Sequence, residues 1–224
     1  MINSKSAHTI QSWLKAIIFC ELSLIVVYFY YKLTGEAVGG TRDISRITAD
    51  AGTLLIVLSF AMSGFSYFFN FLDKYLVYRK YLGLLGFYLT LVHVYYALVF
   101  ALAHPDMALS TGSRVWSFIG AIFALTYFIQ MTLVSNNWAI KIIGGKAQRI
   151  ILRFGYVALA ATVIHFWIRK LPLWEDFMAG DFGSIPPLSL VVFVFAILAF
   201  LLRIAMEVMI RVKSQSKPET TESK

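Results

Sequence analysis

The chain has 224 residues, of which 59% are hydrophobic and 14% are charged, with a mean hydropathy of +0.72 and a formal net charge of +8. Soluble domains average about 25% charged residues, so this composition excludes an ordinary soluble protein. The positive charge is better interpreted as a membrane-topology signal than as a nucleic-acid-binding surface, and no nucleic-acid partner is expected. The single cysteine, Cys20, excludes an intramolecular disulfide and any CxxC motif.

Six apolar stretches are long enough, or nearly so, to cross a hydrocarbon core of about 30 Å as helices. They run from about Trp13 to Leu33, Ala51 to Leu72, Tyr81 to Ala103, Val115 to Ser135, Ile150 to Ile168, and Pro187 to Ile210. No cleavage site follows the first stretch, which we interpret as an uncleaved helix. We therefore predict an all-α membrane protein, a six-transmembrane-helix bundle over residues 13–210 with short connections and no internal repeat. Residues 1–12 are expected to form an N-terminal tail and residues 211–224 a disordered C-terminal tail.

The basic residues predict the orientation of the bundle. If the N-terminus is cytoplasmic, 14 of the 20 lysines and arginines fall on the cytoplasmic side of the predicted spans. Positive residues are enriched in cytoplasmic loops, so both termini are expected in the cytoplasm. The protein is accordingly predicted to lie in the cell inner (plasma) membrane as a multi-pass protein in contact with lipid.

Two histidines lie deep inside predicted spans, His93 in the third and His165 in the fifth. These two helices are both odd-numbered and therefore parallel. His93 follows Lys80 by 13 residues and His165 follows Arg153 by 12, which puts both roughly 18–20 Å from the basic rim. Two imidazoles at one depth on parallel helices favour two axial ligands of one metal centre, and haem iron suits such an apolar site.

Other interpretations remain open for individual residues. A histidine within a bundle can simply hydrogen-bond a neighbouring helix. His104 lies at the outer rim before Pro105, where a loop role is favoured over ligation, and His8 lies in the predicted tail. Glu21, inside the first span, suits either proton relay, a quinone contact or a structural hydrogen bond.

The segment from Arg79 to Leu84 (RKYLGL), followed by His93, resembles the ferric-reductase-like transmembrane family. The stretch SNNW from Ser135 to Trp138 and the later Gln148-Arg149, Tyr156 and His165 resemble its small haem-binding branch, the MsrQ (YedZ) membrane subunits. The similarity covers roughly residues 44 to 170. It implies b-type haem, electron transfer across the membrane and no nucleotide-binding domain, with His93 and His165 matching the outer haem ligands.

The chain departs from that pattern at Leu152, where the family usually has a further histidine. Leucine cannot ligate iron, so we predict a single haem b near the outer face. A second carrier, FMN or a quinone, is one way to bridge the remaining distance. The basic residues Arg79, Lys80, Arg149 and Arg153 could hold a flavin phosphate or a donor protein, although topology alone also explains them.

These features favour a haem-binding electron-transfer subunit of an oxidoreductase system. Its donor would be a cytoplasmic flavin reductase or a quinone, and its acceptor an extracytoplasmic redox partner protein. Two alternatives are a ferric reductase-like enzyme that needs a partner for reducing power and a non-redox membrane transporter or assembly protein. A transporter would more often show broken helices in matching halves, and the sequence has no such pattern.

Overall fold

The computed structural model describes residues 4–34, 38–105, 112–180 and 185–215, and these residues contain no β-strand. The helices are α1 (Ser4–Leu33), α2 (Thr41–Phe68), the 3-10 helix η1 (Asn70–Tyr75), α3 (Tyr78–Ala103), α5 (Gly112–Val134), α6 (Asn137–Arg153), α7 (Gly155–Gly180) and α8 (Leu188–Gln215). Six of the described helical stretches are long and apolar enough to cross a membrane, which confirms the predicted six-span bundle. The chain is a multi-pass membrane protein.

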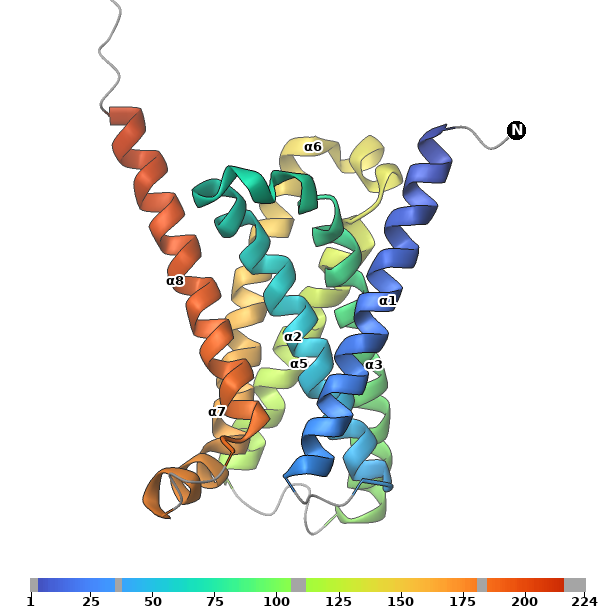
Figure 1. Ribbon diagram of the computed structural model, residues 1–224, viewed down its shortest axis with the longest axis vertical. Coiled ribbons are helices and arrows are strands. Elements are labelled where there is room, and N and C mark those ends of the chain that lie inside the picture. The colour runs from blue at the N-terminus through green and yellow to red at the C-terminus, as the bar shows by residue number, and fades with distance from the viewer. Residues whose placement is uncertain (1–3, 35–37, 106–111, 181–184, 216–224) are drawn as a thin grey trace, which may run out of the picture.

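The long helices form a bundle whose two ends can be told apart by α1 (Figure 1). The near end is where α1 begins, and the far end is where α1 finishes. Helices α3 and α7 both run from the near end to the far end, so they are parallel as expected, whereas α2 and α5 run in the opposite direction. Helix α2 packs on α3 and α8, α5 packs on α7, and α1 packs on both α2 and α3.

Helix α2 begins at Thr41, ten residues before the predicted start of the second span. Its first turn is polar, which hides it from a hydropathy search. The carboxylate of Asp43 accepts hydrogen bonds from the backbone N–H groups of Gly39 and Gly40, at 3.3 and 3.1 Å. An acidic side chain that binds these N–H groups stabilises a helix start, so the helix extends beyond its apolar segment.

Residues between the fourth and fifth predicted spans form α6 rather than a short connection. The side chain of Asn136 caps this helix by accepting a 2.8 Å hydrogen bond from the Ala139 N–H. A kink at Gly144, whose φ of 75° suits glycine, divides the helix. It lies across the near end of the bundle (Figure 1). The fifth span therefore starts at Gly155, not near Ile150.

Helix α2 ends at Phe68, four residues before the predicted Leu72, whereas several other boundaries shift outward. Helix α1 already begins at Ser4, inside the predicted tail, and α8 continues to Gln215, beyond the predicted end at residue 210. Residues 216–224 of the predicted C-terminal tail lie outside the described residues. Pro172 interrupts α7, whose last turns lie across the far end (Figure 1).

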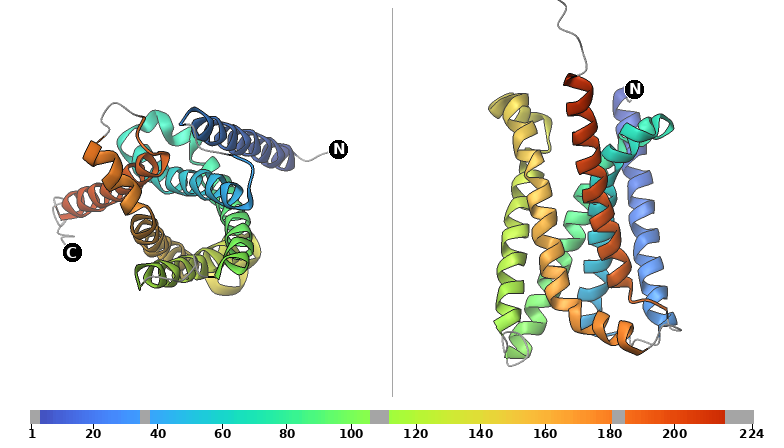
Figure 2. Two further views of the ribbon diagram at one scale, coloured as in Figure 1. Left: turned by 90° about the horizontal axis from the view of Figure 1, so that it is seen from below. Right: turned by 90° about the vertical axis from the view of Figure 1, so that its left-hand side faces the viewer.

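The main apolar core joins α2, α3, α5, α7 and α8. Its buried residues are Ile56, Val57, Phe60, Ala61, Phe87, Ala124, Phe128, Ala158, Leu159, Ala161, Ala196 and Ala199. On α3 and α7 these residues all precede His93 and His165, so the core lies on the near side of both histidines. Seen along the bundle, α2, α3, α5 and α7 surround the centre, with α1 outside α2 (Figure 2).

Candidate functional site

His93 of α3 is held by the first turns of α2. Its Nδ1 atom lies 2.9 Å from the backbone carbonyl oxygen of Ser45 and 2.9 Å from the Ser45 hydroxyl oxygen. The Ser45 hydroxyl in turn donates to the carbonyl oxygen of His93, at 3.3 Å. Ser45 is buried, so this contact is shielded from the surroundings of the bundle. One serine thus binds both the ring and the backbone of the histidine.

His165 of α7 is held in the same way by α5. Its Nδ1 atom lies 2.8 Å from the carbonyl oxygen of Ser117 and 2.9 Å from the Ser117 hydroxyl oxygen. The hydroxyl of Ser117, which is only 1% exposed, donates to the carbonyl oxygen of His165 at 3.4 Å. Each serine precedes its histidine by 48 residues. The sequence prediction of no internal repeat therefore missed a repeated structural unit, with the second copy 72 residues after the first.

These hydrogen bonds determine which ring nitrogen can bind a ligand. A backbone carbonyl oxygen only accepts hydrogen bonds, so Nδ1 of each imidazole carries the proton. The other nitrogen, Nε2, then has the free lone pair. A carbonyl that binds the N–H of a ligating histidine also fixes the ring orientation and raises the basicity of the ligand. In both His93 and His165, Nε2 is therefore the ring nitrogen with the lone pair.

The two half-sites lie close to each other. His93 and His165 are near enough to influence each other electrostatically, and the cationic side chains of Arg169 and Lys170 act on both. These two cations follow His165 along α7, so positive charge lies on the far side of the imidazoles. The apolar core lies on their near side. The site therefore has an apolar boundary in one direction and a cationic boundary in the other.

Two imidazoles alone suit a cofactor that supplies most of its own metal ligands. Haem iron takes four nitrogens from its macrocycle and needs only two axial ligands from the protein. Within the described residues, no group of three or more His, Cys, Asp or Glu side chains could hold a metal ion. The two Nε2 donors, the apolar core and the adjacent cations fit haem, whose macrocycle is apolar and whose propionates are acidic.

Asp50 is a site residue that the sequence reasoning missed. It lies on α2, is 1% exposed, and its carboxylate accepts a hydrogen bond from the hydroxyl of Tyr31 on α1. It also interacts electrostatically with Lys170, Arg46 and His93. An aspartate directly before a predicted span was a usable sequence signal. The predicted second span began only at Ala51, however, so Asp50 was placed outside the membrane.

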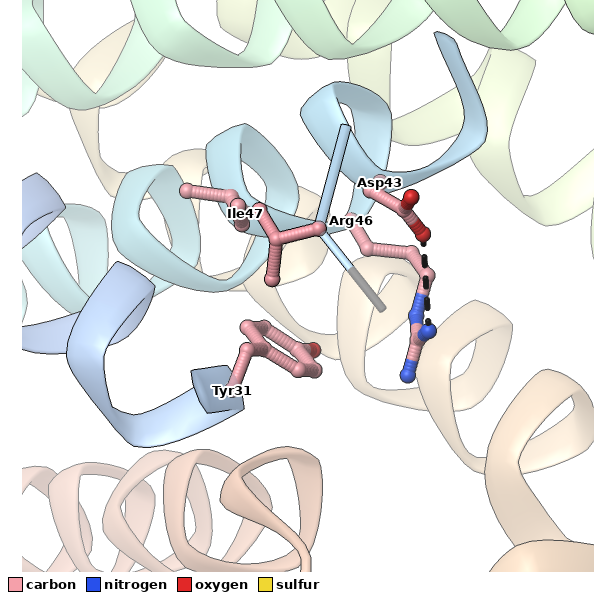
Figure 3. Close-up of a pocket in the computed structure, with 5 residues that line it drawn as sticks. Tyr31, Asp43, Arg46 and Ile47 are labelled. Carbon is pink, nitrogen blue, oxygen red and sulfur yellow. Dashed lines mark ion pairs between the residues drawn. The ribbon is translucent and has the colours of Figure 1, made fainter. Parts of the chain in front are cut away.

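Arg46 connects this carboxylate to the surface at the far end. Its guanidinium carbon lies 4.8 Å from the centre of the Tyr31 ring, and it forms an ion pair with Asp43 at 3.9 Å. Figure 3 shows Arg46 extending past Tyr31 with the ion pair to Asp43. The far ends of α1 and α2 are therefore joined by polar side chains within an otherwise apolar contact that includes Ile47.

The other residues singled out in the sequence are not brought to the histidine pair. Arg79 lies in the first turn of α3 at the near end, 14 residues and about 21 Å along the helix from His93. The side chain of Glu21 is exposed on α1. His104 is exposed at the end of α3, where its ring stacks on Phe100 at 4.6 Å, in keeping with a rim position. His8 lies in α1, and its side chain is outside the described residues.

Comparisons with known proteins find relatives among the heme-binding subunits of protein-methionine-sulfoxide reductases. No protein-family model matches the chain. It is 35% identical over 102 residues to the protein-methionine-sulfoxide reductase heme-binding subunit MsrQ of Brucella anthropi, covering 45% of each chain. It is 28% identical over 141 residues to MsrQ of Rhizobium meliloti, covering 62% of this chain and 63% of that one. The chain is therefore distantly related to the MsrQ proteins.

A second kind of relative is the magnetosome protein MamZ of Magnetospirillum gryphiswaldense, which is 30% identical over 146 residues. The match covers 64% of this chain but 22% of MamZ. The chain thus spans less than two thirds of the length of each of these three relatives.

Proposed function

We propose that the chain is a haem-binding electron-transfer subunit of a membrane oxidoreductase, with His93 and His165 as the two axial ligands of one b-type haem. The observation that carries this proposal is the repeated serine–histidine contact. In both half-sites the Nδ1–H donates to a serine carbonyl oxygen and Nε2 is left to bind iron. The MsrQ relatives are heme-binding subunits, which supports the same assignment.

Haem would supply the one-electron chemistry, since its iron alternates between two oxidation states. The protein residues would bind and orient it. Ser45 and Ser117 hold the two imidazoles in the ligating tautomer, and the apolar core keeps water from the near side. Arg169 and Lys170 provide positive charge for the acidic propionate groups. Because imidazole ligation and hydrogen bonding tune the potential of a haem, the two serines also belong to the redox site.

The proposal is for one haem rather than two. Leu152, where the family pattern has a histidine, ends up in the last turn of α6 and cannot ligate iron. The near half of the bundle is also tightly packed. A methyl group added to Gly155 would meet Met131 at 2.5 Å and Phe60 at 2.7 Å. The Phe60 ring of α2 also packs on Tyr156 of α7 with their centres 4.8 Å apart, so aromatic side chains occupy this part of the bundle.

The direction of transfer is proposed from the charge distribution. If the near end, with Arg79 and the basic residues of α6, faces the cytoplasm, the histidine pair lies toward the outer face. Electrons would then pass from a cytoplasmic flavin reductase or a quinone to an extracytoplasmic redox partner protein. An FMN or quinone near Arg79 would shorten the distance that electrons must cross to reach the haem.

The absorption spectrum of the purified protein tests the proposal. The reduced protein is expected to show b-type haem bands, and the double variant His93→Ala/His165→Ala is expected to lose them. His104→Ala is the matched control, because this histidine is exposed at the helix end and should leave the bands unchanged. Absence of the bands in the wild-type protein, or their persistence in the folded double variant, would rule out this ligand pair.

A further inference from the structure

A cleft of about 490 Å³ runs along the surface between α5 and α7. It is lined by apolar side chains of both helices, including Ile119 and Phe123 on α5 and Val157 and Ala161 on α7. Ile119, Phe123 and Val157 are each 40–49% exposed. None of the described helices covers these side chains. We call this surface the α5–α7 groove.

The repeated half-sites give this groove an equivalent on the other helix pair. The two serine–histidine contacts are 72 residues apart. Subtracting 72 from the residue numbers on α5 shows that Ile119 and Phe123 correspond to Ile47 and Ala51 of α2. Ile47 and Ala51 pack in one cluster with Tyr31 of α1, and Ala51 is completely buried. The positions that are exposed on α5 are therefore covered by α1 on α2.

The second wall of the groove shows the same relation. Val157 and Ala161 of α7 correspond to Leu85 and Leu89 of α3. Leu85 and Leu89 pack in a cluster with Cys20 of α1. Four groove positions thus match four positions that share apolar clusters with α1. Figure 2 shows α1 beside the α2–α3 side of the bundle and no corresponding helix beside α5 and α7.

The face of α1 that fills the first groove indicates what the second would accept. Its buried residues recur every three or four positions and are mostly small: Ser12, Ala16, Cys20, Ser23, Val27 and Tyr31. Small residues at this spacing let helices approach closely within a membrane. Helix α1 also runs parallel to α3, which corresponds to α7 (Figure 1).

The lining of the groove favours a helix over a quinone. A small-molecule site combines apolar walls with a few placed polar groups that orient the ligand. Here the lining side chains are apolar, and the indole N–H of Trp116 is the one polar group among them. The groove also extends from Val157 to Ile168, about 16 Å along α7, which suits several helical turns.

We propose that the α5–α7 groove binds a transmembrane helix of another polypeptide. This helix runs parallel to α7 and presents small side chains to the groove, as α1 does to α2 and α3. The inference does not rest on the proposed electron-transfer function, because the serine–histidine contacts serve only to align the two helix pairs and no cofactor enters the argument.

The probe for this site is a synthetic peptide with the sequence of residues 9–33, the apolar part of α1. The full chain is reconstituted in lipid nanodiscs with Cys20→Ser and a fluorophore attached at Trp167→Cys, an exposed α7 position. Titration of the acceptor-labelled peptide should give saturable energy transfer. Ala160→Phe, which fills the groove, should weaken binding at least tenfold. Leu198→Phe is the matched control, because it enlarges an exposed position on α8 and should leave binding unchanged.

A second peptide tests the predicted chemistry of the partner. Replacing Ala16 and Cys20 by leucine should abolish binding if small side chains are needed for close approach. The thermal midpoint of each chain variant shows that it is folded. Non-saturable transfer, equal binding to the Ala160→Phe chain, or equal binding of the leucine peptide would overturn the proposal. A dimer of the chain that Ala160→Phe dissociates would overturn it as well, because the occupant would then be a second copy.

Discussion

The α2–α3 pair and the α5–α7 pair build the same serine–histidine contact in different surroundings. Gly52 and Gly86 bring α2 and α3 together so closely that a methyl group added to Gly86 would lie 2.8 Å from the Gly52 carbonyl oxygen. The equivalent positions on α5 and α7 are Ala124 and Ala158, both buried. One pair therefore packs through bare backbone and the other through methyl groups, while the histidine geometry is unchanged.

The environments of the two pairs differ even more than their packing. The first pair is covered by α1 and contains the buried carboxylate of Asp50. The position 72 residues later is Ile122, which is 51% exposed. What the two pairs share is limited to the groups that orient the imidazoles. This comparison indicates that the serine–histidine geometry is the constrained feature, and that the buried carboxylate and the cover by α1 belong to the first pair.

Removing one histidine at a time is expected to give the largest effect and tests whether the halves are equivalent. His93→Ala and His165→Ala should each lower haem affinity by more than the roughly 10–100-fold that loss of an outer hydrogen-bond partner costs. Titration of haem into the haem-free protein measures this. Similar losses would support equivalent half-sites, whereas tight six-coordinate binding in either variant would show that the residue is not a ligand.

Two glycine substitutions test the packing difference. Gly86→Ala should destabilise the protein by about 1–3 kcal/mol, because the added methyl group would press on the backbone of α2. Gly120→Ala should be neutral or stabilising by roughly 0.5–1 kcal/mol, since alanine favours a helix interior and its nearest contacts would be 3.7 Å away. Thermal unfolding in detergent measures both. Equal effects would contradict the close approach of α2 and α3.

Tyr31→Phe tests the polar link that the first half has and the second lacks. It leaves the buried Asp50 carboxylate without its hydroxyl donor, at an expected cost of about 1–3 kcal/mol. Tyr88→Phe, at a 51% exposed position on α3, is the control and should change the thermal midpoint little. If the hydroxyl matters only to Asp50, adding Tyr31→Phe to an Asp50→Leu chain should cost much less. If Tyr31→Phe destabilises the Asp50→Leu chain as much as the wild-type chain, the loss of stability comes from another contact of Tyr31.

The sequence predicted the span count and the parallel direction of α3 and α7, because hydropathy is a local property and the order of the spans determines their direction. It did not predict Ser45, Ser117 or Asp50. Serine is common in membrane helices, and the contact over 48 residues depends on how two helices pair. Asp50 was lost because the polar first turn of α2 moved the predicted start of that span. The open α5–α7 groove required both copies of the repeated unit to be compared in space.

The smallest expected effect comes from the serine hydroxyls and bears on the feature that the halves share. Ser45→Ala and Ser117→Ala keep the carbonyl acceptor but remove the hydroxyl oxygen 2.9 Å from Nδ1. Weaker hydrogen bonding at Nδ1 makes the imidazole a poorer donor to iron, so the oxidised haem is less stabilised and the midpoint potential should rise by tens of millivolts. Redox titration measures the shift, and Ser→Thr variants, which restore the hydroxyl, should reverse it. Equal shifts in the two halves would extend their equivalence from geometry to electronic effect, whereas a shift in one alone would show that only that serine hydroxyl tunes its histidine.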